Sequence, residues 1–292
     1  MKDPTLPQER LLVEMRLLKK AGFVHQDLNL NTQGQEGYPL AMDGWEAWID
    51  RVRLESSRLG VDFHQAHSFY YRTKESTSNS IDRPWYEERI RRSICAARRL
   101  GVKWLVLHPC DFDQDPAYDF AKARRFNLDY WRPFVEMAAK EEVGIAFENL
   151  FQSGHHQRYC SIAEELADLV DAFDNPYAGI CWDTGHAYVA GQDQDAAIRM
   201  LGKRIKATHI HDNHGQPKGD EHLMPYYGTL NWNHILKALA EIDYEGNFSF
   251  ELKHATQPLP PSLCEDMLRF LYGLGMKMIG KIEEYRKGKM AI

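Results

Sequence analysis

Apolar and polar positions alternate along this chain in two patterns, one with the spacing of a helix and one with the spacing of a strand. Residues 5–21 place apolar side chains at helical intervals, Thr5 and Gln8 have the spacing of an N-terminal capping box, and Gly22 is a stop signal. Residues 24–31 then alternate apolar with polar positions, as one-sided strands do. The beginning of the chain therefore predicts one helix followed by one strand.

The same unit recurs to the end of the chain. Further helices are expected at 45–59, 84–100, 119–142, 161–172, 194–201, 231–241 and 262–286. Further strands are expected at 61–69, 103–109, 143–150, 178–186, 205–212 and 247–253. Strands that alternate with helices predict a parallel sheet covered by helices. Seven such strands, without a Gly-x-Gly-x-x-Gly turn, favour a (β/α)8-type TIM barrel over a doubly wound sheet.

An eight-stranded barrel needs one more strand before the first helix, but only residues 1–4 are left for it. We therefore expect an α/β fold of the (β/α)8 TIM-barrel type whose first strand is missing or atypical. No linker, repeat or low-complexity tract divides the chain, so residues 1–292 are expected to form a single domain.

Composition narrows the class of protein. The chain is 43% hydrophobic and 27% charged, as is usual for globular proteins, and its net charge of -6 disfavours nucleic acid as a partner. No run of 18 apolar residues and no signal-peptide pattern is present, so no membrane association is expected. The five cysteines are scattered without a Cys-x-x-Cys pair, which suits a reducing compartment. A cytoplasmic enzyme is the resulting expectation.

Several of the later strands end in residues that could bind a metal ion. In such barrels the chemistry lies at the C-terminal ends of the strands. The residues at these ends are Glu148, Asp183, His209 and Glu251. Alternation places Ser249 and Glu251 on one face, opposite Phe248 and Phe250, so Glu251 should point into the barrel. A carboxylate there is costly unless it is paired, hydrogen-bonded or bound to a metal.

Three carboxylates and one imidazole form a mostly hard ligand set. It suits one divalent ion, Mn²⁺ in preference to Mg²⁺, Co²⁺ or Zn²⁺, and leaves positions for substrate oxygens. Such an ion can hold a carbonyl and its neighbouring hydroxyl and stabilise an enediolate. Two glutamates on opposite sides could then serve as base and acid. Each of these residues also has a simpler interpretation, a structural hydrogen bond at a polar rim.

With these residues the chain resembles the sugar phosphate isomerase/epimerase family of the xylose-isomerase-like TIM barrel superfamily. The resemblance runs from residue 5 and rests on "LHP", "FENL", "WDTGH", "HIHD", "DEH" with "GTLNW", and "FELK", in that order. It implies that Glu148, Asp183, His209 and Glu251 hold the metal, that Glu148 and Glu251 transfer the proton, and that the substrate is a sugar or sugar phosphate. The remaining polar residues of the rim are assigned to the substrate: His64, His67, His108, His186, His211, Asp220 and His222.

Other residues have weaker assignments. Three aromatic residues could line the sugar pocket or simply pack: Trp182, Trp232 and Tyr226. Three lysines could contact a phosphate but are better interpreted as solvated: Lys203, Lys206 and Lys218. The remaining histidines are expected at the surface: His25, His155, His156, His214, His234 and His254. In "HIHDNHG", His209 is the expected ligand, His211 faces the substrate on the same side of the strand, and Asp212 faces the other way and anchors the loop.

Three alternatives remain open. The superfamily includes AP-endonuclease-type DNA repair enzymes with three zinc ions, whose ligand pattern also matches most of these residues, although the negative net charge argues against that function. Dehydratases that act on inososes or dehydroshikimate use a similar metal site. A barrel that binds sugar without turnover would be expected to lack a ligand, and all four are present. The atypical first strand also leaves open a homo-oligomer that completes the barrel.

Overall fold

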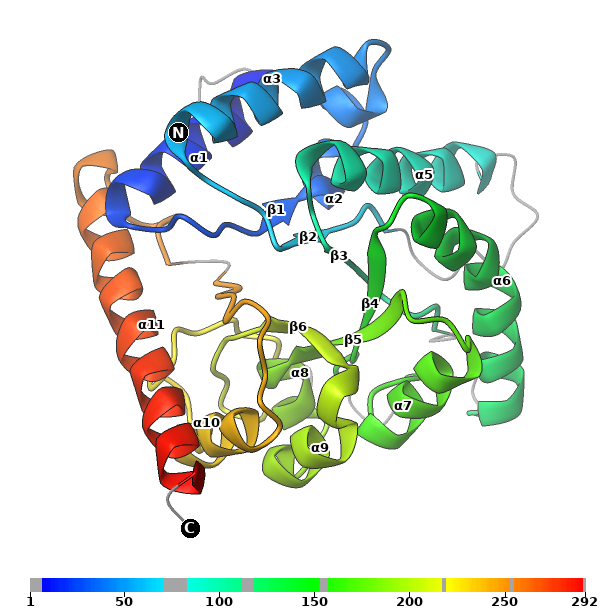
Figure 1. Cartoon of the computed structure of the whole chain (residues 1–292), viewed down its shortest axis with the longest axis vertical. Coiled ribbons are helices and arrows are strands. Elements are labelled where there is room, and N and C mark those ends of the chain that lie inside the picture. The colour runs from blue at the N-terminus through cyan, green and yellow to red at the C-terminus, as the bar shows by residue number, and fades with distance from the viewer. Residues whose placement is uncertain are drawn as a thin grey trace.

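Helices and parallel strands alternate along the chain, and the strands curve around a common interior with the helices outside them (Figure 1). The computed structural model describes residues 7–70, 83–111, 118–152, 157–216, 219–252 and 255–290. The strands are β1 Leu28–Asn29, β2 Gln65–His67, β3 Trp104–Leu107, β4 Gly144–Glu148, β5 Ala178–Asp183 and β6 Ile205–His209. Each pairs in parallel with the next, in the order β1 to β6.

The helices lie close to their predicted positions. The long ones are α1 Pro7–Ala21, α3 Trp45–Leu59, α5 Arg83–Leu100, α6 Phe120–Lys140, α7 Ala163–Ala172, α9 Gln194–Leu201, α10 Trp232–Glu241 and α11 Pro261–Met290. The short ones are α2 Leu30–Gln33, α8 Thr184–Val189, and the 3₁₀ turns η1 Pro39–Ala41 and η2 Gly202–Arg204. Local signals set several ends: the Asp119 side chain caps α6, and Gly60 ends α3 in the left-handed conformation. Thr5, half of the predicted capping box, lies outside the described residues.

Apolar side chains of the helices and of the outer face of the sheet form one large core. Ile235, Leu236 and Leu239 of α10 are buried there, at the spacing of one helix face. The described part of the chain contains no helix that is both long and apolar enough to span a membrane.

The interior of the barrel is filled by a separate set of small side chains. Val106, Ala146, Cys181 and Ala207 are fully buried together, each two residues before a polar strand end. Because strand side chains alternate, this apolar layer and the polar layer above it face the same interior. Beneath it, the Trp104 ring lies against the backbone of Gly144, where a side chain would overlap it.

Several strands are shorter than the sequence pattern predicts. The predicted strand at 24–31 contains only β1 and an isolated bridge at His25, because Asn29 caps α2 by accepting a hydrogen bond from the Thr32 N–H. The predicted strand at 178–186 ends at Asp183, because its carboxylate caps α8 by accepting from the His186 N–H. Polar residues that end a strand here also begin the next helix, which alternation alone does not indicate.

The barrel has an open side between its first and last strand segments. The segment 247–252 follows β6 in the wall. It is joined to it by a bridge of Ile210 with Phe250 and by a hydrogen bond from Thr208 Oγ1 to the Asn247 carbonyl. Within the described residues, no strand lies between this segment and residues 24–27. A cavity of about 560 Å³ occupies this position, lined by both segments, by α1 and by α11, which lies across this side of the molecule (Figure 1). Among the residues that the structure describes, no strand therefore closes the wall at the position of the atypical first strand.

The contact between Trp104 and Gly144 yields a test of packing. Gly144→Ala should lower the free energy of unfolding by about 1–3 kcal/mol, because the new methyl group overlaps the Trp104 ring, which is partly buried and packs against the interior layer. Urea denaturation measures the change. Gly273→Ala is the matched control, since that glycine lies in α11 with open space around it and the variant should be neutral or slightly more stable. Equal stabilities for the two variants would contradict this packing.

Candidate metal centre

The ends of consecutive strands bring four potential ligands to one place. Glu148, Asp183 and His209 are the last residues of β4, β5 and β6, and Glu251 follows the bridge at Phe250. Their ligand atoms all lie within 4.8 Å of one another. Glu148, Asp183 and His209 are almost completely buried, whereas the Glu251 side chain is about a third exposed. The group is therefore deep in the barrel and open on the Glu251 side.

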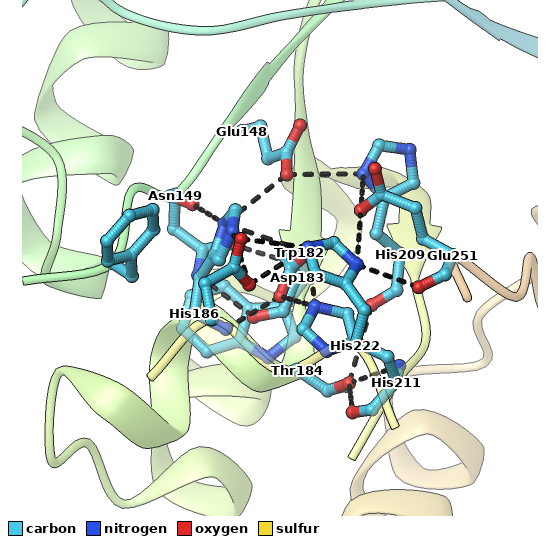
Figure 2. Close-up of polar contacts among 12 residues, drawn as sticks. Glu148, Asn149, Trp182, Asp183, Thr184, His186, His209, His211, His222 and Glu251 are labelled. Carbon is cyan, nitrogen blue, oxygen red and sulfur yellow. Dashed lines mark hydrogen bonds and ion pairs between the residues drawn. The ribbon is translucent and has the colours of Figure 1, made fainter. Parts of the chain in front are cut away.

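His209 directs one ring nitrogen into this group. Its Nδ1 lies 3.2 Å from Glu148 Oε1 and 3.4 Å from Glu251 Oε2 (Figure 2). Within the described part of the chain, neither Nδ1 of His209 nor Oε2 of Glu251 has a hydrogen-bond partner, although both atoms are buried. Buried polar atoms without hydrogen bonds are costly, and a shared cation would satisfy both. The donor set thus fits a divalent metal ion.

Asp183 is fixed by its neighbours in β4 and α8. Asn149 Oδ1 accepts from the Asp183 N–H at 2.7 Å, and Asn149 Nδ2 donates to the Asp183 carbonyl at 2.9 Å. Asp183 Oδ1 accepts from the His186 N–H at 2.7 Å, and a ring nitrogen of His211 lies 2.9 Å from the same carboxylate oxygen. Its orientation is therefore set before any ligand binds.

Charges within the centre stabilise one another. Burial raises the pKa of Glu148, but His209 and His108 outweigh it and hold that pKa well below its usual value. Burial likewise raises the pKa of Asp183, but His186 and His211 lower it to about 2. Both carboxylates are consequently ionised at neutral pH, as metal ligands must be.

A second cluster of four ligand atoms lies beside the first and contains His186, His211, Asp220 and His222. His222 Nε2 lies 2.9 Å from Asp220 Oδ2, and the His211 and His222 rings stack at 4.0 Å. Burial opposes a charge on His186, but Asp183, Asp220 and Glu148 outweigh it and raise its pKa to about 10. The His211 ring is fully buried against Asp183, which favours support of that carboxylate over the expected contact with substrate.

A third cluster combines Glu148 with two histidines from earlier strands. Glu148 Oε2 lies 3.1 Å from His108 Nε2 and 3.6 Å from His67 Nε2. Its Oε1 faces His186 and His209 (Figure 2). The Tyr70 ring stacks on His108 at 4.4 Å. His108 is partly exposed and is therefore accessible from the mouth of the barrel.

One residue assigned to the substrate lies elsewhere. His64 precedes β2, and its carbonyl accepts from the Lys103 and Trp104 N–H groups at the start of β3, the opposite end of the strands. It lies three positions before His67, an odd number, so the two side chains do not share a strand face. The structure does not bring His64 to the metal centre.

The weaker assignments divide in the same way. Lys203 donates a hydrogen bond to the Asp243 carbonyl. Lys206 is near the start of β6 and lies over the Trp104 ring, whereas His209 is at the other end of that strand. Trp182 lies in the outer core, Trp232 donates to Asp212, and Tyr226 is exposed. Asp212 also accepts from the Tyr226 and Leu230 N–H groups and so anchors its loop as expected.

The histidines expected at the surface are largely there. His25, His214 and His234 are exposed or half-exposed, and the first two pair with Asp62 and Glu221. Lys218, His155, His156 and His254 lie outside the described residues.

Sequence reasoning missed two polar residues that the structure brings below the metal centre. Asp27, next to β1, accepts from Gln65 Nε2 at 2.7 Å, and Gln65 also donates to the Thr208 carbonyl at 3.1 Å. A signal was available, because Asp27 and Asn29 share the strand face opposite Leu28 and Leu30. A polar face on a barrel strand points inward, where polar residues need partners.

Comparisons with known proteins agree with this architecture. Residues 15–274 match the family described as xylose isomerase-like TIM barrel. An uncharacterised protein of Sinorhizobium fredii is 28% identical over 262 residues, 80% of this chain and 78% of the relative. The inosose isomerase of Bacillus velezensis is 25% identical over 181 residues, 60% of this chain and 63% of the relative. Two further relatives are covered over only 56% and 61% of their length.

The crystal structure of a D-tagatose 3-epimerase-like protein superposes with a TM-score of 0.76 over 95% of this chain and 96% of the other, at 22% identity. At that identity the likeness shows the fold.

The charged histidines of the centre yield a prediction for the metal-free protein. Its stability should fall as the pH rises from about 6.5 to about 10, because folded His186 keeps a proton that the unfolded chain releases near 6.5. Below about 6.5 this stabilisation is complete, and each pH unit above it should remove up to roughly 1 kcal/mol. Urea denaturation in the presence of a metal chelator, at several pH values, measures the slope of the free energy of unfolding against pH.

His186→Gln should flatten that slope, whereas His25→Gln, at an exposed histidine, should leave it unchanged. A pH-independent stability of the unsubstituted, metal-free chain over this range would contradict the charge on His186.

Proposed function

Since the chain belongs to the xylose isomerase-like TIM barrel family, we propose that it is a divalent-metal-dependent isomerase or epimerase of a sugar or sugar phosphate. One observation carries the proposal: four ligand atoms from Glu148, Asp183, His209 and Glu251 converge within 4.8 Å, and two of these residues present buried atoms that lack hydrogen bonds in the described chain. Three carboxylates and one imidazole favour Mn²⁺, with Mg²⁺, Co²⁺ and Zn²⁺ as alternatives. The bound ion would supply positive charge for the substrate oxygens on which negative charge develops.

Proton transfer is assigned to the two glutamates. Glu148 is ionised and enclosed by His67, His108, His186 and His209, so its carboxylate is held in one orientation. Glu251 is the more exposed of the two and lies on the other side of His209. A sugar carbon between the two carboxylates would lose its proton to one and regain it from the other, which changes configuration or moves the carbonyl.

The partly exposed polar groups near the centre support a sugar as the substrate class. The His108 ring, stacked on Tyr70, and the Asp220 carboxylate offer hydrogen-bond donors and acceptors, as a polyhydroxylated substrate needs, whereas His222 is buried between Asp220 and the Glu251 carbonyl. The names of the similar proteins, an inosose isomerase and a D-tagatose 3-epimerase-like protein, support a cyclitol ketone or a ketose.

A second function is favoured by one specific observation. Glu148 presents Oε1 to the four-residue centre and Oε2 to His67 and His108, and a further cluster forms around Asp220. Three adjoining clusters would suit three zinc ions in an AP-endonuclease-type enzyme, and Glu148 would be a ligand shared between clusters. The net charge of -6 disfavours a DNA substrate, so this function ranks second.

Metal content separates the two functions. Protein purified and reloaded with Mn²⁺ or Zn²⁺ should hold one ion per chain by plasma mass spectrometry, and Asp183→Asn should hold none, because it removes an oxygen donor from the centre. Asp220→Asn should keep the one ion. About three zinc ions per chain, falling to two in Asp220→Asn, with cleavage of abasic-site DNA, would instead establish the second function.

Glu251→Gln tests the chemistry. With ketohexoses or inososes in deuterated water, the variant should incorporate deuterium at the carbon next to the carbonyl at least about 10²-fold more slowly, because an amide cannot accept the proton. Nuclear magnetic resonance of the product measures this and also detects loss of water, the signature of a dehydratase. Glu245→Gln, at an exposed glutamate before the same strand segment, is the control. Unchanged exchange in Glu251→Gln would remove Glu251 from catalysis.

A further inference from the structure

Asp27 lies behind His209, on the side of the ring that faces away from the metal centre. Its Oδ2 lies 3.6 Å from His209 Nε2, whereas Nδ1 of the same ring faces Glu148 and Glu251. The two ring nitrogens therefore face two different sets of carboxylates. Glu148 and Glu251 belong to the proposed ligand set, and Asp27 does not.

Asp27 is held in place by both neighbouring parts of the wall. Its Oδ2 accepts from Gln65 Nε2 at 2.7 Å on β2 and from Ser249 Oγ at 3.0 Å on the last strand segment. Gln65 is itself anchored on the carbonyl of Thr208, the residue before His209. A carboxylate fixed from two sides, one of them tied to the backbone next to His209, can hold the orientation of that ring.

The chemistry of imidazole makes this orientation important. A neutral histidine carries its proton on one nitrogen and offers the lone pair of the other, and only the lone pair binds a metal. A carboxylate facing Nε2 favours the proton there and leaves the Nδ1 lone pair free. Such carboxylate–histidine pairs fix both the tautomer and the ring orientation in metal sites.

We propose that Asp27 is a positioning residue that accepts a hydrogen bond from Nε2–H of His209 and thereby directs its Nδ1 to the metal. The inference rests on the proposed metal centre. The hydrogen bond requires the 3.6 Å separation to shorten to about 3 Å. Because Asp27 also receives the Ser249 hydroxyl, the same carboxylate joins the two strand segments that border the open side.

Metal affinity and the state of His209 test this role together. Asp27→Asn should weaken Mn²⁺ binding about 10- to 100-fold, measured by the electron paramagnetic resonance of free Mn²⁺, since partners of metal-bound histidines have effects of this size. In the Zn²⁺-loaded protein, ¹⁵N resonances should show His209 with a protonated Nε2 and a coordinated Nδ1. Asp27→Asn and Asp27→Ala should lose or broaden the Nε2–H signal, and a purely structural role would leave it intact.

Asp62→Asn is the matched control. Asp62 also pairs with a histidine, His25 at 2.7 Å, but that pair is exposed and lies away from the centre, so binding and the His209 signals should not change. Wild-type affinity and an intact Nε2–H signal in both Asp27 variants would overturn the proposal. Failure of the unsubstituted protein to bind Mn²⁺, or wild-type binding by Asp183→Asn, would instead disprove the metal centre itself.

Discussion

The burial of ionised groups at one end of the barrel is the constraint on which the rest of this structure depends. Glu148 is almost completely buried, and a lone carboxylate there would be prohibitively costly. Each of its oxygens is met by two imidazoles, contributed by strand ends and loops that are far apart in the sequence. The charges therefore have to come together, and parallel strands bring them together because their C-terminal ends lie at the same rim of the barrel.

The layer of apolar side chains beneath the metal centre helps to bring these charged groups together. Small side chains at Val106, Ala146, Cys181 and Ala207 let the strands approach closely, and the polar residue two positions later in each strand then faces the same axis. Larger residues in this layer would separate the strand ends and the ligand atoms with them. The alternation of side chains along each strand therefore determines both the packing of the interior and the geometry of the metal centre.

Much of this could be predicted from sequence, since the periodicity of apolar residues depends on local structure. The helices, the parallel order of the strands and the inward face of Glu251 followed from spacing alone. The strand at 178–186 was predicted too long, because Asp183 acts as a helix cap, which alternation does not report. The burial of His211, the distance of His64 from the centre and the part played by Asp27 depend on contacts between strands distant in sequence.

The open side has a consequence for the solubility of the chain. Residues 24–27 and 247–252 line this cavity, and strand edges that are left uncovered can pair with edges of other molecules. Closed barrels have no such edges. Here α11 lies over the opening and contributes Leu271, Tyr272 and Ile279 to its lining. The last helix thus covers two strand segments, and we expect a chain shortened within it to aggregate more readily.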